Sequence, residues 1–262
     1  MIEALLAVAY LLGQADGERL PDAFAVHAQQ AAGDYQFQIS SSTGRVLELR
    51  TEPILRWSNP VPEKQMRGEV FVWTNGGRPA AVLNVFQMDE GNGFQEWHEF
   101  SSLADVTLTA TAPKNRHWSP LASQLMMSAV PNASPPAPYP RQRLIQMRNL
   151  ASSFTCRKIN RKDEAYALRL LPQPLLRYES KSHGVSDGGL FTFVEATDPE
   201  VFLMLEVREV DNVAQWHFGF VRMASVQLQA SWDNKTVWST ETLPYADYRN
   251  RPDLPYALLI VR

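Results

Sequence analysis

The chain has 262 residues, of which 45% are hydrophobic and 20% are charged, a composition typical of a folded globular protein and unlike that of a disordered chain. Its formal net charge of −3 provides no general attraction to nucleic acid or to an anionic membrane surface. The single cysteine, Cys156, excludes an intramolecular disulfide and any metal site built from several thiolates.

Residues 1–15 have the pattern of a secretory signal peptide. Residues 5–12 form a short apolar run, and Gly13 and Ala15 are small residues placed as at a cleavage site. The run is too short to span a bilayer as a helix, so we expect no integral membrane segment in the mature chain. Glu3 stands where signal peptides carry positive charge, and the alternative is an N-terminal helix packed on the body. The sequence therefore predicts a periplasmic or secreted protein, with a cytoplasmic protein as the alternative.

The next predicted element is a helix. Ala25, Ala28 and Ala32 recur at helical spacing, and Asp22, directly after Pro21, can cap the start of the helix.

Strands dominate the remainder of the first half. Residues 35–39 alternate between apolar and polar side chains, and a turn at 42–44 leads into 46–49, which predicts a hairpin. Turn residues at 75–78, Asn-Gly-Gly-Arg, separate two of the strands that follow. We expect these strands at 53–57, 69–74, 79–87, 95–103, 105–111 and 116–119.

The second half has the same predicted order. Leu144, Met147 and Leu150 recur at helical spacing after Pro140, which predicts a helix. A turn at 211–212, Asp-Asn, again separates strands. We expect the strands of this half at 166–170, 174–178, 189–195, 200–208, 214–222, 226–232 and 235–239, with a last strand at 256–261.

The two halves align with each other as an internal duplication. Residues 23–120 match 142–240 at a near-constant offset, and the rare tryptophans of the two halves meet in order. Between the halves, residues 120–140 contain five prolines after position 130, which predicts a stiff, extended connector.

These patterns predict an α+β fold of two tandem repeats related by a pseudo-two-fold axis, each repeat one helix followed by a curved antiparallel sheet. The two repeats could form two lobes or one continuous sheet. The expected boundaries are 1–15 for the signal peptide, 16–120 for the first repeat, 121–140 for the linker and 141–262 for the second repeat with the C-terminal strand.

Two basic–aromatic pairs, Arg56-Trp57 and Arg177-Tyr178, occupy equivalent positions and are candidates for a binding site. An arginine could clamp an anionic ligand through two hydrogen bonds, and it could equally pair with an acid of the fold or lie over an aromatic ring. The two halves differ just after the pair, where Asn59 is a further candidate.

Two histidines, His98 and His217, each follow a tryptophan. Histidines can act as acid/base groups or as metal ligands, and His98 is followed by Glu99. Neighbours on a strand point to opposite faces, so we expect each histidine on the face opposite its tryptophan. The second half has Phe218 in place of the glutamate. This pattern favours packing over catalysis.

Sequence motifs for catalysis are absent. The chain has no Gly-x-Ser-x-Gly elbow, phosphate-binding loop, dinucleotide fingerprint or His-Glu-x-x-His motif. We therefore assign no catalytic residue, no metal ligand and no cofactor, although catalytic triads form in space and need no sequence motif.

Five segments resemble a family of uncharacterised proteins from planctomycete-type bacteria. They are 53–60 (PILRWSNP), 68–73 (GEVFVW), 77–79 (GRP), 98–103 (HEFSSL) and 170–178 (LLPQPLLRY). The resemblance covers most of residues 25–240 and implies a bacterial, exported protein. It implies no known activity.

We expect a non-enzymatic exported protein that binds or scaffolds an unknown ligand or protein, and no nucleic acid. The reason is that both halves share packing and turn residues but no catalytic group. The alternative is a hydrolase with a site between the lobes, using His98 or His217 with Glu99.

Overall fold

The computed structural model describes residues 22–40, 44–61, 64–113, 116–120 and 125–261. Strands make up 56% of the described residues and helices 15%. The expected α+β fold of two helix-plus-sheet repeats is therefore wrong, because the protein is predominantly β. Its large antiparallel sheets dominate, and the described part of the chain contains only three α-helices.

The first large sheet has five antiparallel strands in the order β17–β5–β4–β3–β2. Its strands are β2 (Glu48–Val61), β3 (Lys64–Asn75), β4 (Arg78–Asp89), β5 (Phe94–Ser102) and β17 (Tyr256–Ile260). The last strand of the chain thus pairs with β5, more than half the sequence away.

The second large sheet has nine strands, eight of them in the order β16–β15–β9–β10–β12–β13–β14–β8, with β11 paired to β12 beside this path. The strands are β8 (Ser128–Ala129), β9 (Phe154–Ile159), β10 (Ala165–Leu170), β11 (Leu176–Ser180), β12 (Val185–Glu195), β13 (Asp198–Val210), β14 (Val213–Arg222), β15 (Gln227–Trp232) and β16 (Lys235–Thr240). The proline-rich segment before Pro140 thus contributes a strand, β8, to this sheet.

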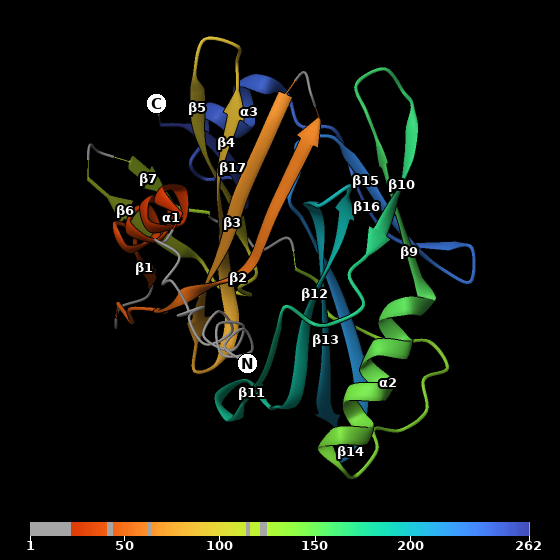
Figure 1. The fold of residues 1–262 in the computed structure, drawn as a ribbon. Coiled ribbons are helices and arrows are strands. Elements are labelled where there is room, and N and C mark those ends of the chain that lie inside the picture. Colours follow the sequence, from red (N-terminus) through yellow and green to blue (C-terminus); the bar gives the residue numbers. More distant parts are fainter. Residues whose placement is uncertain (1–21, 41–43, 62–63, 114–115, 121–124, 262) are drawn as a thin grey trace, which may run out of the picture.

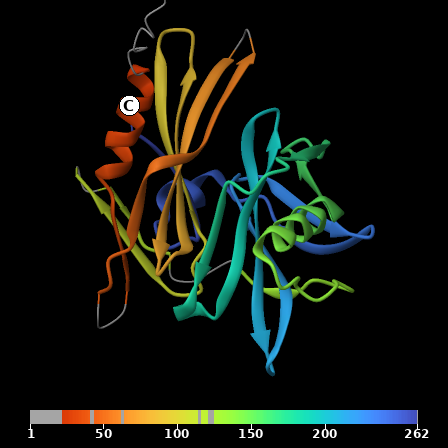
Figure 2. The ribbon, with the colours of Figure 1, turned by 60° about the horizontal axis from the view of Figure 1, so that its bottom comes forward.

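A small third sheet and the helices complete the structure. The small sheet has the order β1–β6–β7 and consists of β1 (Gln36–Ile39), β6 (Leu108–Ala112) and β7 (Arg116–Trp118). The helices are α1 (Ala23–Gly33), α2 (Pro140–Ser153), α3 (Tyr245–Asn250) and the short 3-10 helix η1 (Lys181–His183). Helices α1 and α2 lie on opposite outer sides, with the two large sheets between them (Figure 1 and Figure 2).

Three apolar clusters hold these layers together. The first joins α1 and the small sheet to β3, β4 and β5, and the second joins α2 to the nine-stranded sheet. The third, the central cluster, lies between the two large sheets. It includes Trp57, Val70, Val82, Leu190, Phe202 and Val221.

Burial on both faces explains the continuous apolar run of β13. Phe202 and Met204 belong to the central cluster, whereas Val201, Leu203 and Leu205 belong to the second cluster. A strand covered on both faces needs no polar side at these positions. The two-repeat prediction was wrong because the pattern of residues within a strand does not determine which strand it pairs with.

Local signals in the sequence were more reliable. Asp22 is the N-cap of α1, and its side chain accepts a hydrogen bond from the Phe24 backbone N–H at 3.0 Å. The predicted turns at 75–78 and 211–212 are confirmed, with left-handed backbone at Gly76 and Gly77 and at Asp211 and Asn212. Residues 42 and 43 of the third predicted turn lie outside the described residues. None of the helices in the described part is long and apolar enough to cross a membrane. The predicted signal peptide at 1–15 lies outside the described residues.

Candidate functional site

His98 and Glu99 point to opposite faces of β5, as neighbours on a strand must. His98 is fully buried on the side of α1, where its Nδ1 lies 2.7 Å from the Tyr35 hydroxyl and its Nε2 lies 3.0 Å from Glu96 Oε1. Glu99 faces the other sheet, and its Oε1 accepts a hydrogen bond from the Tyr256 hydroxyl at 2.6 Å. The two side chains therefore cannot act together on one substrate.

The surroundings of these two residues are those of structural groups. His27 of α1 also contacts Glu96, at 2.7 Å, so a carboxylate between two imidazoles fastens the helix to β5. Hydrogen bonds from these histidines hold the pKa of Glu96 at about 2, against the opposing effect of burial. Burial raises the pKa of Glu99 to about 8, because Tyr256 and Asn84 compensate only part of the desolvation.

The residues predicted around β2 serve the fold in different ways. Arg56 is exposed and pairs through Nε with Glu69 Oε1 at 2.9 Å. Trp57 is buried, and its Nε1–H donates to Asn84 Oδ1 at 3.0 Å. Asn59 is half-buried and contributes to the wall of a small cavity of about 240 Å³.

In the nine-stranded sheet, the guanidinium of Arg177 is already occupied by Asp187. Nε and Nη2 of Arg177 donate to this carboxylate at 2.9 and 2.7 Å, and Arg143 of α2 donates to it at 2.7 Å. His217 is half-buried opposite Glu206 in the register of β14 and β13. Its Nδ1 is buried and has no hydrogen-bond partner among the described residues.

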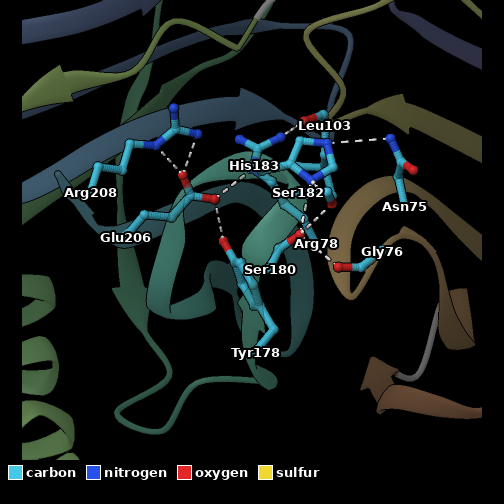
Figure 3. A network of polar contacts seen from close by, with 10 residues as sticks. All are labelled: Asn75, Gly76, Arg78, Leu103, Tyr178, Ser180, Ser182, His183, Glu206 and Arg208. Atoms are coloured by element: carbon cyan, nitrogen blue, oxygen red, sulfur yellow. Dashed lines mark hydrogen bonds and ion pairs between the residues drawn. The ribbon is translucent and has the colours of Figure 1, made fainter. Parts of the chain in front are cut away.

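A polar network joins the two large sheets (Figure 3). Glu206 of β13 accepts hydrogen bonds from Arg78 Nε of β4 at 2.7 Å and from the Tyr178 hydroxyl of β11 at 2.8 Å. Arg208 Nε donates to the other carboxylate oxygen at 2.6 Å. The carboxylate is fully buried, so these bonds supply the compensation that a buried charge requires.

Beside Glu206, a serine–histidine contact also joins the sheets (Figure 3). Ser180 Oγ donates to the Gly76 carbonyl at 2.6 Å and lies 2.9 Å from His183 Nδ1. Since the hydroxyl has one proton, Nδ1–H of His183 must donate to Ser180. Ser180 is also 2% exposed. This arrangement positions a turn and does not activate a nucleophile.

The α3 pocket, of about 380 Å³ and formed by α3, β7 and β17, offers room for a ligand. A second pocket of about 330 Å³ lies beside Arg177, but Asp187, which lines it, already pairs with Arg177 and Arg143. Arg249 and Arg251 provide the charge of the α3 pocket, and none of its described lining residues is acidic. Its lining consists of His117, Tyr248, Arg249, Asn250, Arg251, Pro252, Ala257, Leu259 and Ile260. Pockets of this size and mixed character are typical of small-molecule sites.

Arg249 differs from Arg56, Arg177 and Arg251 because no acidic side chain among the described residues pairs with it. Its guanidinium carbon lies 4.6 Å from the Trp97 ring centroid and 4.4 Å from that of Tyr245. Its Nε is buried without a hydrogen-bond partner among the described residues, as is Nε1 of Trp97. Burial lowers the pKa of Arg249 from its ordinary value, and no carboxylate among the described residues opposes this.

Sequence reasoning did not find this pocket. Tyr245, Tyr248 and Arg249 follow Pro244 at the i, i+3 and i+4 spacing of one helical face, and this was the available signal. The approach of Trp97 from β5 depends on the pairing of β5 with β17, which no local pattern reveals.

Comparisons with known proteins found no matching family, curated protein or solved structure. The described residues contain no cluster of three or more histidine, cysteine or acidic side chains able to hold a metal ion.

Proposed function

We propose that this protein is a binding protein that holds a small anionic ligand in the α3 pocket. The observation that carries the proposal is Arg249, a partly buried cation that lines the pocket and has no acidic partner among the described residues. A desolvated charge without a counterion is costly, and an anion bound in the pocket would supply the missing partner.

The hydrolase alternative has less support. Of its two histidines, His217 lies opposite Glu206 in the register of β14 and β13. His98 and Glu99 face opposite sides of β5, and His98 is fully buried. Substrate could not reach both groups without opening the sheet packing.

Isothermal titration calorimetry with acetate, octanoate, benzoate and inorganic phosphate tests the proposal. We expect at least one of these anions to bind, and Arg249→Gln to weaken its binding about tenfold or more, since hydrogen bonds to charged groups contribute about 1.5–3 kcal/mol. Arg141→Gln on the exposed side of α2 is the matched control and should bind like wild type.

The proposal is wrong if no probe binds at about 1 mM, or if Arg249→Gln and Arg141→Gln bind equally well. Circular dichroism of both variants separates a lost ligand contact from a lost fold.

We also propose that the protein is exported, as its first fifteen residues predict. Intact-mass analysis of the protein from its native host tests this separately. Cleavage after Ala15 would support export, and an uncleaved cytoplasmic form would refute it.

A further inference from the structure

The ring contacts of Arg249 restrict how a ligand can approach it. Trp97 and Tyr245 both lie within cation–π distance of the guanidinium, and Nε is enclosed. The remaining donors are the Nη groups at the outer edge of the guanidinium plane. A planar fork of this kind matches the two oxygens of a carboxylate.

The charge of the α3 pocket favours a ligand with a single negative charge. Arg251, the other arginine of the lining, already pairs with Asp253, at 2.6 Å between Nη2 and Oδ2 and 3.2 Å between Nε and Oδ1. Arg249 is therefore the one lining arginine without a carboxylate partner among the described residues. A phosphate dianion would bring one charge more than the pocket compensates.

Beside the arginines, the α3 pocket has an apolar part that an inorganic anion bound to Arg249 would leave uncovered. Pro252 and three residues of the edge strand β17, Ala257, Leu259 and Ile260, line this part of the pocket. Leu259 and Ile260 are neighbours and point to opposite faces of β17, so the apolar lining runs around the edge of the strand. Ile260 is the most exposed large apolar side chain of this lining, at 44%. Covering such side chains with a hydrocarbon or aromatic body removes apolar surface from water, which favours binding.

We infer that the ligand of the α3 pocket is an amphiphilic monocarboxylate, with its carboxylate on Arg249 and its apolar body along β17. The inference rests on the proposed anion-binding function and names its ligand class. Arg249 supplies charge recognition, whereas Ile260 and Leu259 select for the apolar body.

The test compares octanoate with acetate and inorganic phosphate by titration calorimetry on the full chain. Octanoate should bind about tenfold tighter than acetate or better, because its longer chain buries additional methylene groups. Phosphate should bind more weakly than octanoate. Arg249→Gln should weaken the binding of octanoate.

A second pair of variants tests the apolar part of the pocket. Ile260→Ser should reduce the preference for octanoate over acetate at least about threefold, while acetate binding stays as in wild type. Val213→Ser is the matched control, because Val213 is also an exposed branched residue on a strand but lies outside the pocket lining. This control should keep the full preference.

The possible failures are distinct. If phosphate binds as tightly as octanoate and Arg249→Gln weakens both, the carboxylate class is wrong and anion binding stands. If acetate binds as tightly as octanoate and Arg249→Gln weakens both, the apolar body of the ligand is wrong and anion binding stands. If Ile260→Ser keeps the full preference, the position of the apolar body is wrong. If no probe binds, or Arg249→Gln changes nothing, both proposals fail.

Discussion

Replacing Glu206 by glutamine should strongly destabilise the contact between the two large sheets. Glu206 is fully buried and accepts hydrogen bonds from Arg78, Tyr178 and Arg208. Glutamine has nearly the same volume but no charge, so the variant leaves Arg78, whose side chain is 3% exposed, without its counterion.

The burial of Glu206 sets the loss of free energy of unfolding that we expect for Glu206→Gln. Breaking a buried ion pair by removing one partner costs about 3–5 kcal/mol, because the remaining charge is left uncompensated. The matched control is Glu195→Gln, whose side chain is 42% exposed in its ion pair with Lys158. Lys158 keeps Glu200 as a second partner, so the control should lose less than about 1 kcal/mol.

Urea unfolding, monitored by tryptophan fluorescence, measures the free energy of unfolding of both variants. The double variant Arg78→Met, Glu206→Gln should lose less free energy of unfolding than the two single losses summed, since the residues share one interaction. A loss for Glu206→Gln no larger than that for Glu195→Gln would refute the assigned role of this carboxylate.

Two further predictions concern packing and pH. Gly68→Ala should lower the free energy of unfolding in urea by about 1–3 kcal/mol, because the new Cβ would lie 2.5 Å from Trp57 Nε1. The control Gly33→Ala should leave this free energy unchanged, because nothing lies within 4 Å of its Cβ position. Equal losses in the two variants would count against the close contact at Gly68. Burial raises the pKa of Glu99 from 4.5 to about 8, so between these values the folded state holds a proton that the unfolded chain has released. The free energy of unfolding should therefore fall as the pH rises through this window, by up to about 1.4 kcal/mol per pH unit, and Glu99→Gln should reduce this slope. An unchanged slope in the variant would show that another group causes it.

Strand patterns predict which face of a strand a candidate residue lies on, but not whether that face is buried. Strand alternation places neighbours such as His98 and Glu99 on opposite faces of β5, which the hydrolase alternative did not take into account. Whether either face was buried depended on what covered it, and in the folded protein α1 covers one side and the other large sheet covers the other. Both side chains consequently became buried structural groups.

Sequence by itself determined the elements set by neighbouring residues. The cap at Asp22, the turn at Gly76 and Gly77 and most strands depend on backbone preferences and spacing within a few positions. The tertiary structure alone decided that β17 pairs with β5 and that β8 joins β14. It also placed Arg249 against Trp97, across 152 residues of sequence. Such contacts are fixed by packing and burial of the whole chain, because the hydrophobic effect is non-directional and strand edges accept many partners.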